Sequence, residues 1–277
     1  MAMPWIHNSC GEKGGVGKSI LSQALAEYFL QQQQKVPLIC EADRSNGDVG
    51  RAFEGKQRVI YPYFTEDSDQ LDKADTLLDE VLASNTDAVV NSPAQSHRAL
   101  VNWLSQGSAD LALEEGVKLC FWFVTSGEYD SVSLFLESLQ EFDGIPHILI
   151  RNRHFTDRLT YDYSDPDANE SLGTALKAYK VPVIYLPRFG TADLDFLKAH
   201  SLTFGEAISR DGGLTIAARS RVKRALTTFF SQLDALEIFT NGTSDDNGAE
   251  PAPKAPARKK RGRAKKSVGN SSKDGDS

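Results

Sequence analysis

Cysteines are few in this sequence, and long hydrophobic runs are missing. Cys10, Cys40 and Cys120 form no C-x-x-C pair, which excludes a disulfide framework and a cysteine-based zinc site. No stretch of about 18 uncharged apolar residues occurs, so we expect no membrane-spanning helix. The first residues lack a basic region followed by an apolar stretch, so we expect no secretory signal. These absences predict a protein of the reducing cytoplasm.

The charge of the chain is unevenly distributed. Its 277 residues, of which 40% are hydrophobic and 25% charged, suffice for one large α/β domain. The net charge is −7, but residues 1–240 carry −11 and residues 241–277 carry +4. The segment 241–277 has no hydrophobic periodicity, so we expect a disordered basic tail there. We therefore divide the chain into a folded domain, residues 1–240, and this tail.

The basic residues of the tail are concentrated in one stretch. Residues 254–266 hold eight Lys and Arg residues and no acidic residue, and seven of the eight lie between Arg258 and Lys266. Such a stretch attracts phosphate backbones or an acidic partner. A solubilising tail that binds nothing specific explains it equally well.

The stretch from Cys10 to Ser19 organises the rest of the chain. It follows a strand-like run, Trp5–Ser9, and opens a helix-like run at Ser19, which is the layout of a phosphate-binding loop. Its glycines can adopt backbone angles closed to other residues, so consecutive N–H groups can turn around an anion. Lys18 provides a charge for terminal phosphates, and Ser19 provides a hydroxyl for Mg²⁺. The residues expected to surround a nucleotide are Gly14, Gly15, Val16, Gly17, Lys18 and Ser19.

The loop departs from the general G-x-x-x-x-G-K-[ST] pattern at two positions. Glu12 occupies the first glycine position, and Lys13 adds a lysine before the glycine pair. The resulting K-G-G-x-G-K-[ST] sequence resembles the deviant Walker A loop of the ParA/MinD family of ATPases. The resemblance implies an enzyme that hydrolyses ATP with Mg²⁺, with Lys18 as the Walker lysine. It also implies a nucleotide-sandwich homodimer, in which Lys13 reaches the phosphates of the second subunit.

Two acidic motifs of that family are altered here. Where the family carries D-x-D at the end of a strand, this sequence has Glu41-Ala42-Asp43, and the resemblance assigns the organisation of Mg²⁺ and water to Asp43. Where the family carries D-x-P, Asn91 replaces the acid. A neutral amide can hydrogen-bond metal-bound water but cannot offset the charge of the cation. We therefore place Ser19, Asp43 and Asn91 around the metal, and predict slow hydrolysis that an Asn91→Asp substitution accelerates.

Three further matches are less specific. Asn152-Arg153 follows a strand-like run and resembles a family signature in which the asparagine reads the adenine edge. Arg188 and Phe189 follow the next strand and are candidates for stacking on the base. The last helix, at about residues 214–238, carries a basic cluster that predicts non-specific DNA binding, although an ordinary solvated helix face explains it as well. That cluster is Arg219, Arg221, Lys223 and Arg224.

Strand-like and helix-like segments alternate along residues 4–240. Compact apolar runs at residues 36–40, 87–90, 117–124, 146–150 and 181–186 are separated by segments with helical periodicity. This alternation predicts a doubly wound, mainly parallel sheet flanked by helices, the P-loop NTPase class. The nucleotide is then expected beyond the carboxyl ends of the strands. We expect residues 157–169 to form a mobile polar loop, and residues 51–70 have no functional interpretation.

These motifs leave three functions open. The first is a dimerising ATPase of plasmid or chromosome partition or of cargo positioning, which binds DNA and a partner protein that stimulates hydrolysis, in the bacterial cytoplasm with association to the nucleoid as one option. The second, also implied by the resemblance, is an accessory ATPase of plasmid mobilisation or conjugal transfer. The third is a nucleotide-dependent binding module that rarely hydrolyses ATP. Attachment to a membrane through a C-terminal amphipathic helix is disfavoured, because residues 241–277 are polar and lack periodicity.

Overall fold

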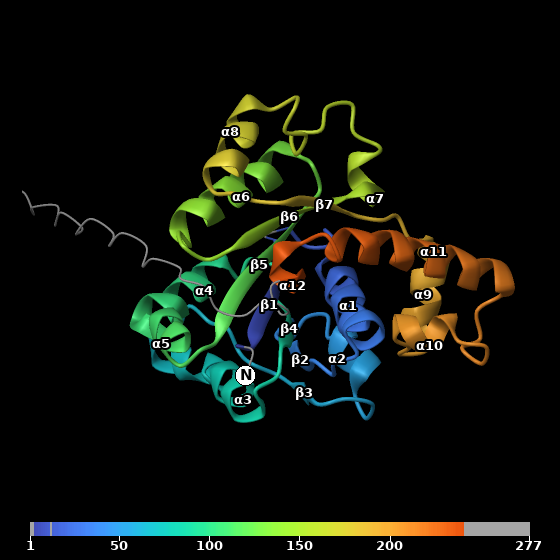
Figure 1. Cartoon of the computed structure of the whole chain (residues 1–277), viewed down its shortest axis with the longest axis horizontal. Helices are drawn as coiled ribbons and strands as arrows, with labels where there is room; N and C mark the ends of the chain where they lie inside the picture. Colours follow the sequence, from blue (N-terminus) through green and yellow to red (C-terminus); the bar gives the residue numbers. More distant parts are fainter. Residues whose placement is uncertain (1–2, 12, 241–277) are drawn as a thin grey trace, which may run out of the picture. The chain divides into compact units, whose positions relative to one another are not determined.

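A seven-stranded parallel sheet forms the centre of the protein (Figure 1). The computed structural model describes residues 3–11 and 13–240, so the predicted tail and its basic stretch lie outside the described residues. The strand order is β3-β2-β4-β1-β5-β6-β7, which places β1 in the middle. The strands are β1 (Trp5–Cys10), β2 (Leu38–Glu41), β3 (Val59–Ile60), β4 (Ala88–Asn91), β5 (Lys118–Thr125), β6 (His147–Asn152) and β7 (Val183–Leu186). The predicted doubly wound, parallel sheet flanked by helices is confirmed.

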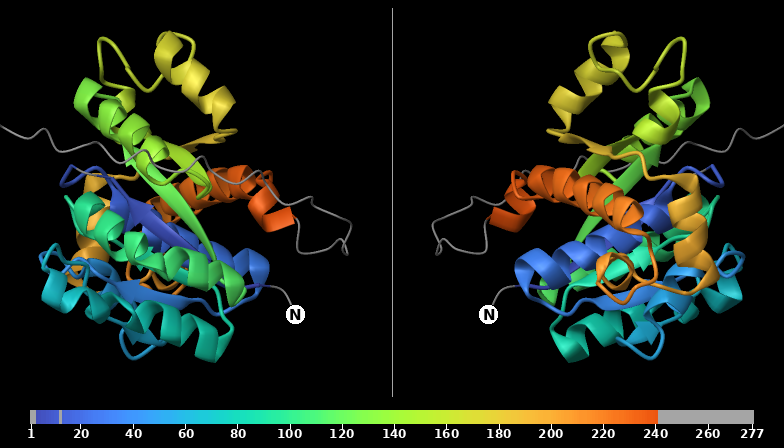
Figure 2. Two further views of the ribbon diagram at one scale, coloured as in Figure 1. Left: turned by 90° about the vertical axis from the view of Figure 1, so that its left-hand side faces the viewer. Right: turned by 90° about the vertical axis from the view of Figure 1, so that its right-hand side faces the viewer.

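Helices cover both faces of the sheet (Figure 2). One layer consists of α3 (Thr76–Ser84), α4 (His97–Trp103), α5 (Ala109–Glu114), α6 (Tyr129–Glu141) and α8 (Glu170–Ala178). The other consists of α1 (Lys18–Tyr28), α2 (Asp48–Phe53), α9 (Thr191–Ala199), α10 (Phe204–Ile208), α11 (Ile216–Leu233) and α12 (Glu237–Thr240). In β5, Phe121 and Phe123 pack in the first layer, whereas Cys120 and Trp122 pack in the second. This alternation is the period of two that a strand buried on both faces requires.

The short helical segments account for most differences from the predicted boundaries. The first helix, expected to reach Gln34, ends its α-helical part at Tyr28 and continues as a π-helical turn, η1 (Phe29–Gln33). The last predicted helix, over residues 214–238, is divided into α11 and α12. The remaining segments are η2 (Ser68–Ala74), η3 (Leu104–Ser108) and α7 (Arg153–Thr156). Residues 51–70 contain the edge strand β3, whose two residues are too few to produce a readable pattern.

The carboxyl ends of three central strands bring separate motifs together. In the register of the sheet, Ser9 on β1 lies beside Asn91 on β4, and Asn91 lies beside Glu41 on β2. The loop that follows β1 contains the glycine-rich motif, and the segment that follows β2 contains Asp43. The fold therefore places the predicted motifs at one edge of the sheet, where open α/β sheets bind their ligands.

Residues 157–169, expected to be a mobile polar loop, are tied to the sheet. Arg151 at the end of β6 is buried, and its Nη2 donates to Asp162 Oδ2 at 2.6 Å. Its Nε donates to Ser164 Oγ at 3.1 Å, and its Nη1 to the Tyr185 hydroxyl at 3.0 Å. A buried guanidinium with several acceptors fixes the geometry of all of them, because each is matched to the planar fork of donors. The segment is thus an ordered cover over the ends of β6 and β7.

All three cysteines are buried. Burial raises the pKa of the Cys40 and Cys120 thiols, because a thiolate loses its hydration in the core. Among residues 3–11 and 13–240, no helix is long and apolar enough to cross a lipid bilayer.

Two histidines are buried as neutral rings. Burial lowers the pKa of His7 to about 4, and burial lowers that of His147 to about 4 as well. The Trp122 indole Nε1 donates to His7 Nδ1 at 3.1 Å, so protonation of that nitrogen would set two donors against each other. His147 Nε2 lies 3.0 Å from Ser138 Oγ, and its Nδ1 lies 2.8 Å from the carbonyl of Ile145.

We expect the protein to lose stability as the pH falls from about 6.5 to about 4. In this window the unfolded chain binds protons at both histidines while the folded chain does not, so protonation favours unfolding. The loss amounts to a few kcal/mol, and its slope should be reduced in a His7→Gln variant, whose amide oxygen can still accept from Trp122. Urea unfolding at pH 7.5 and pH 5 measures the effect. If the free energy of unfolding depends equally on pH in the wild type and the His7→Gln variant, His7 does not cause the loss of stability.

Candidate functional site

The glycine-rich loop between β1 and α1 forms an open cradle. Gly15 (φ +77°) and Gly17 (φ +108°) adopt left-handed backbone conformations that favour glycine. Among the described residues, no atom lies within 4 Å of a Cβ added at Gly14 or Gly15. No side chain of the described residues caps the first turn of α1, and that turn contains no acidic residue. Its N–H groups and the positive end of the helix dipole are therefore suited to an anion.

The two lysines of the loop point to different partners. Lys18 is buried, and its Nζ donates to the carbonyls of Gly11 and Lys13 at 3.0 and 3.2 Å. Lys13 is one-third exposed, and its Nζ lies 2.9 Å from Glu128 Oε2 and 3.6 Å from Asp130 Oδ2. The hydrogen bond to Glu128 raises the pKa of Lys13 and lowers that of Glu128. Lys18 thus belongs to the cradle, whereas Lys13 lies in a surface ion pair beside it.

The carboxylate of Asp43 is held by its own turn. Its Oδ1 accepts from the backbone N–H and hydroxyl of Ser45, at 3.0 and 2.6 Å, and from the N–H of Asn46 at 3.2 Å. Within the described residues its Oδ2 has no recorded hydrogen bond. Asp43 and Ser19 both line the cleft beside the loop. Two of the three predicted metal ligands are therefore brought together.

Asn91, the third predicted ligand, lies behind the cleft. It is fully buried and is absent from the cleft lining. Its Nδ2 donates to Glu41 Oε1 at 2.8 Å, while its buried Oδ1 has no hydrogen-bond partner in the part of the chain that the structure describes. The described residues contain no cluster of three or more His, Cys, Asp or Glu side chains suited to a metal. A cation here would consequently depend on Ser19, Asp43 and the phosphates of its ligand.

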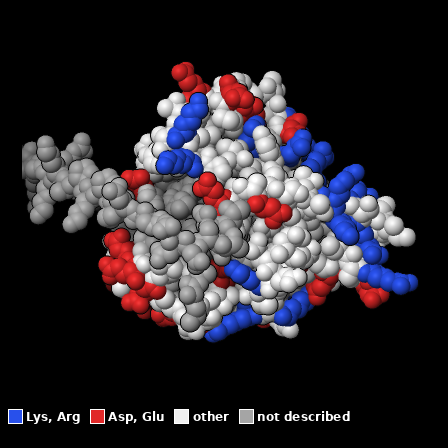
Figure 3. Space-filling view, in the orientation of Figure 1, with Lys and Arg blue, Asp and Glu red and all other residues white. Residues whose placement is uncertain are grey.

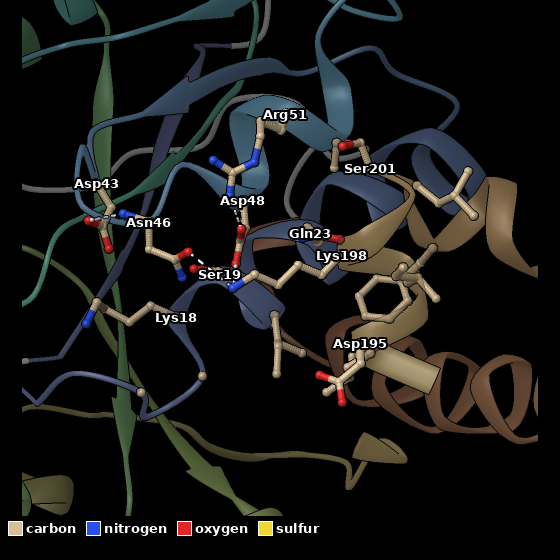
Figure 4. Close-up of a pocket in the computed structure, with 18 of the residues that line it drawn as sticks. Lys18, Ser19, Gln23, Asp43, Asn46, Asp48, Arg51, Asp195, Lys198 and Ser201 are labelled. Carbon is tan, nitrogen blue, oxygen red and sulfur yellow. Dashed lines mark hydrogen bonds and ion pairs between the residues drawn. The ribbon is translucent and has the colours of Figure 1, made fainter. Parts of the chain in front are cut away.

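The cleft extends from the loop to the helices that follow β7 (Figure 4). Its volume is about 340 Å³, and one wall comprises α2 and the opposite wall α9 and α10. Lys198 of α9 reaches across, with its Nζ 2.8 Å from Asp48 Oδ2 and 3.4 Å from Asn46 Oδ1. Arg51 also pairs with Asp48. Sequence reasoning missed these cleft residues, because a contact between segments about 150 residues apart leaves no local pattern.

Asn152, predicted to read adenine, holds the loop itself. It is buried, its Nδ2 donates to the carbonyl of Val16 at 2.7 Å, and its Oδ1 accepts from the N–H of His154. Arg188 is exposed and does not line the cleft. Phe189, proposed to stack on a base, is buried in the core, with its ring stacked on Phe204 at 4.9 Å. The stacking role of Phe189 was therefore wrong, because the turn after β7 directs its ring inward.

The predicted DNA-binding cluster on α11 is divided. Arg221 donates from Nε and Nη2 to the buried carboxylate of Asp193 on α9, at 3.2 and 2.9 Å. Arg219 donates to the carbonyl of Ile208. Lys223 and Arg224 are exposed, and no ion pair is recorded for either among the described residues. Basic side chains gather near α11 on the right of Figure 3. Half of the cluster thus has a structural partner, and half faces solvent.

Comparison with known proteins gives related chains in bacteria and archaea. No protein-family model matches the chain. A TraL protein of Escherichia coli is 27% identical over 249 residues, covering 86% of this chain and 100% of TraL. MobD of Acidithiobacillus ferrooxidans is 29% identical over 156 residues, covering 55% of this chain and 65% of MobD. The solved structure of the septum site-determining protein MinD from Pyrococcus horikoshii, complexed with Mg-ADP, has 18% identity and a TM-score of 0.47, covering 84% and 96% of the two chains.

The glycine-rich loop resembles that of the ParA/MinD type in its two lysines. It stands between the central strand of a parallel sheet and the first helix. The ParA/MinD-type loop fits a nucleotide phosphate, because its cradle is open and the first turn of α1 has no side-chain cap. The unpartnered Oδ1 of Asn91 is the feature that departs from a ParA/MinD site with a full set of acids.

Proposed function

We propose that the protein binds ATP with Mg²⁺ and hydrolyses it slowly. The observation that carries this proposal is the open, glycine-lined cradle at the uncapped start of α1, with the buried amine of Lys18 beside it. Lys18 would bind the terminal phosphates, and Ser19 and Asp43 would hold the cation and its water. When bound, Mg²⁺ neutralises phosphate charge. Asn152 would position the loop through Val16. Its predicted contact with the adenine edge and the predicted stacking of Arg188 on the base stay predictions.

Lys13 would serve a second copy of the chain. Its ion pair with Glu128 joins side chains that are 33% and 54% exposed, and such pairs contribute at most about 1 kcal/mol. Lys13 can therefore leave Glu128 and contact a phosphate bound to a second subunit at little cost in free energy. An ATP-dependent homodimer follows, in which Lys13 from each copy contacts the nucleotide of the other.

The setting we propose is plasmid transfer or mobilisation. The relatives TraL and MobD bear the names of plasmid transfer and mobilisation proteins, and the TraL match covers that protein's whole length. This favours an accessory ATPase of transfer over an ATPase of partition. A partner protein would stimulate hydrolysis, and Lys223 and Arg224 would provide non-specific DNA contacts that weaken steeply with salt.

The proposal is tested by a Lys13→Ala substitution. We expect wild-type protein to dimerise with ATP but not with ADP, and the variant to dimerise at least about tenfold more weakly, because each subunit loses one charge-assisted contact of about 1.5–3 kcal/mol. Analytical ultracentrifugation with each nucleotide measures this, and DNA retention is measured in parallel. Glu128→Gln is the matched control: it removes the nearer of the two acidic partners of Lys13 and should leave ATP-dependent dimerisation intact. If the Lys13→Ala variant dimerises with ATP as strongly as the wild-type protein does, the proposed role of Lys13 is wrong.

A second candidate is a module that binds ATP but does not turn it over. The neutral, buried side chain of Asn91 favours it, since this position cannot offer a charge to metal-bound water. Single-turnover hydrolysis with and without DNA separates the two functions. Tight ATP-dependent dimerisation without product formation would support the module.

A further inference from the structure

Glu41 makes four hydrogen bonds that join three segments at the edge of the sheet. Its Oε1 accepts from Asn91 Nδ2 at 2.8 Å and from the N–H of Asp43 at 3.0 Å. Its Oε2 accepts from the N–H groups of Val49 and Gly50, both at 3.0 Å. Those two N–H groups belong to the first turn of α2, whose N-cap residue provides no side-chain acceptor. Glu41 is only 2% exposed, so it caps α2, braces the Asp43 turn and binds Asn91 at once.

Glu41 and Asn91 lie so close together that the two positions can hold one negative charge between them but not two. The Asn91 amide donates to Glu41 across the β2–β4 pairing, where the two residues lie side by side in register. A carboxylate at position 91 would set acceptor against acceptor, and two buried carboxylates in contact cannot both ionise without a large penalty. Asparagine is therefore the residue that complements Glu41. The glutamate side chain, one methylene longer than aspartate, spans the distance to both β4 and α2.

We propose that Glu41 is the positioning residue of the candidate nucleotide site. It places on β2, beside Asn91, the carboxyl group that β4 lacks at this position, and it holds the Asp43 turn and the start of α2 in place. Through α2 it also sets Asp48, the residue that Lys198 contacts across the cleft. This inference rests on the proposed function for its role toward Mg²⁺, but the coupling of the two side chains does not depend on that function.

One consequence reverses the expectation drawn from sequence alone. Asn91→Asp by itself should not accelerate hydrolysis, because the new carboxylate meets Glu41 rather than the cleft. The combined Glu41→Gln/Asn91→Asp variant is the one that moves a single charge to β4. The amide introduced at position 41 can donate to the new acid, which restores a hydrogen bond in the opposite direction.

A cycle of unfolding measurements tests the coupling. We expect Asn91→Asp to lower the urea midpoint strongly, Glu41→Gln to lower it less, and the double variant to unfold at a higher urea concentration than Asn91→Asp alone. Asn8→Asp is the matched control: Asn8 is also buried, but it pairs in register with Val90 and so lies on the other face of the sheet. Adding Glu41→Gln to Asn8→Asp should destabilise it further. Additive losses at positions 41 and 91 would overturn the pairing.

A second readout separates positioning from packing. The Mg²⁺ concentration for half-maximal binding of a fluorescent ATP analogue should rise at least about fivefold in Glu41→Gln and return toward the wild-type value in the double variant. A Mg²⁺ requirement that Glu41→Gln leaves unchanged would overturn the positioning role. If wild-type protein does not bind the analogue, the proposed function fails, whereas the unfolding cycle still decides whether positions 41 and 91 are coupled.

Discussion

Replacing Lys18 by alanine is expected to weaken ATP binding by about 10²- to 10⁴-fold. The buried amine makes two contacts with loop carbonyls, and in the proposed complex it would turn to the phosphates instead. Charge-assisted hydrogen bonds contribute about 1.5–3 kcal/mol each, and every 1.4 kcal/mol is a factor of ten in affinity. Titration with a fluorescent ATP analogue measures the loss.

Lys56→Ala is the control for this experiment. Lys56 pairs with Glu206 at 2.6 Å and does not line the cleft, so its removal alters net charge by the same amount without touching the cradle. Its affinity for the analogue should equal that of the wild type. If Lys18→Ala binds as tightly as Lys56→Ala, the phosphate-binding role of the loop is wrong.

Gly17→Ala should both destabilise the fold and abolish nucleotide binding. The backbone of Gly17 has φ +108°, and a Cβ there would lie 2.6 Å from Asn152 Nδ2. The substitution therefore combines a strained conformation of about 1–3 kcal/mol with damage to the hydrogen bond between Asn152 and Val16, so we expect a loss of about 2–4 kcal/mol. Thermal unfolding measures the first effect, and the ATP-analogue titration the second.

Gly14→Ala provides the comparison within the same loop. Gly14 has no left-handed backbone angle, and a Cβ added to it meets nothing within 4 Å. Its unfolding temperature should therefore stay close to that of the wild type. Equal losses at positions 14 and 17 would mean that the loop does not depend on its contact with Asn152.

The glycine-rich loop between a strand and a helix and the parallel sheet were predictable because both depend on local signals. Three glycines, two lysines and a serine between a strand and a helix need no tertiary information, and the alternation of strands and helices predicts the parallel sheet. The end of each strand also placed Glu41, Asp43 and Asn91 at the same edge. Local sequence patterns do not predict which of these side chains contact one another.

The features that the sequence did not predict all depend on contacts between residues that are distant in the sequence. Glu41 was interpreted as an altered acid beside Asp43, whereas its carboxylate binds Asn91 and α2. The amide of Asn152 donates to the carbonyl of Val16, a contact that the sequence did not predict. Residues 157–169 were expected to be mobile because they are polar, but the buried Arg151 supplies the donors that order them. In each case a long side chain forms hydrogen bonds with a backbone group or an acidic side chain that is distant in the sequence. The spacing of residues in the sequence does not indicate which partner this will be.

The burial of Cys10, Cys40 and Cys120 has a practical consequence for watching subunits associate. Thiol reagents attack the thiolate, and buried thiols with raised pKa values react slowly. A single cysteine introduced at an exposed position away from Lys13, such as Tyr179 with 41% exposure, can therefore be labelled with a dye in the otherwise native chain. Energy transfer between two labelled populations would then report association in real time.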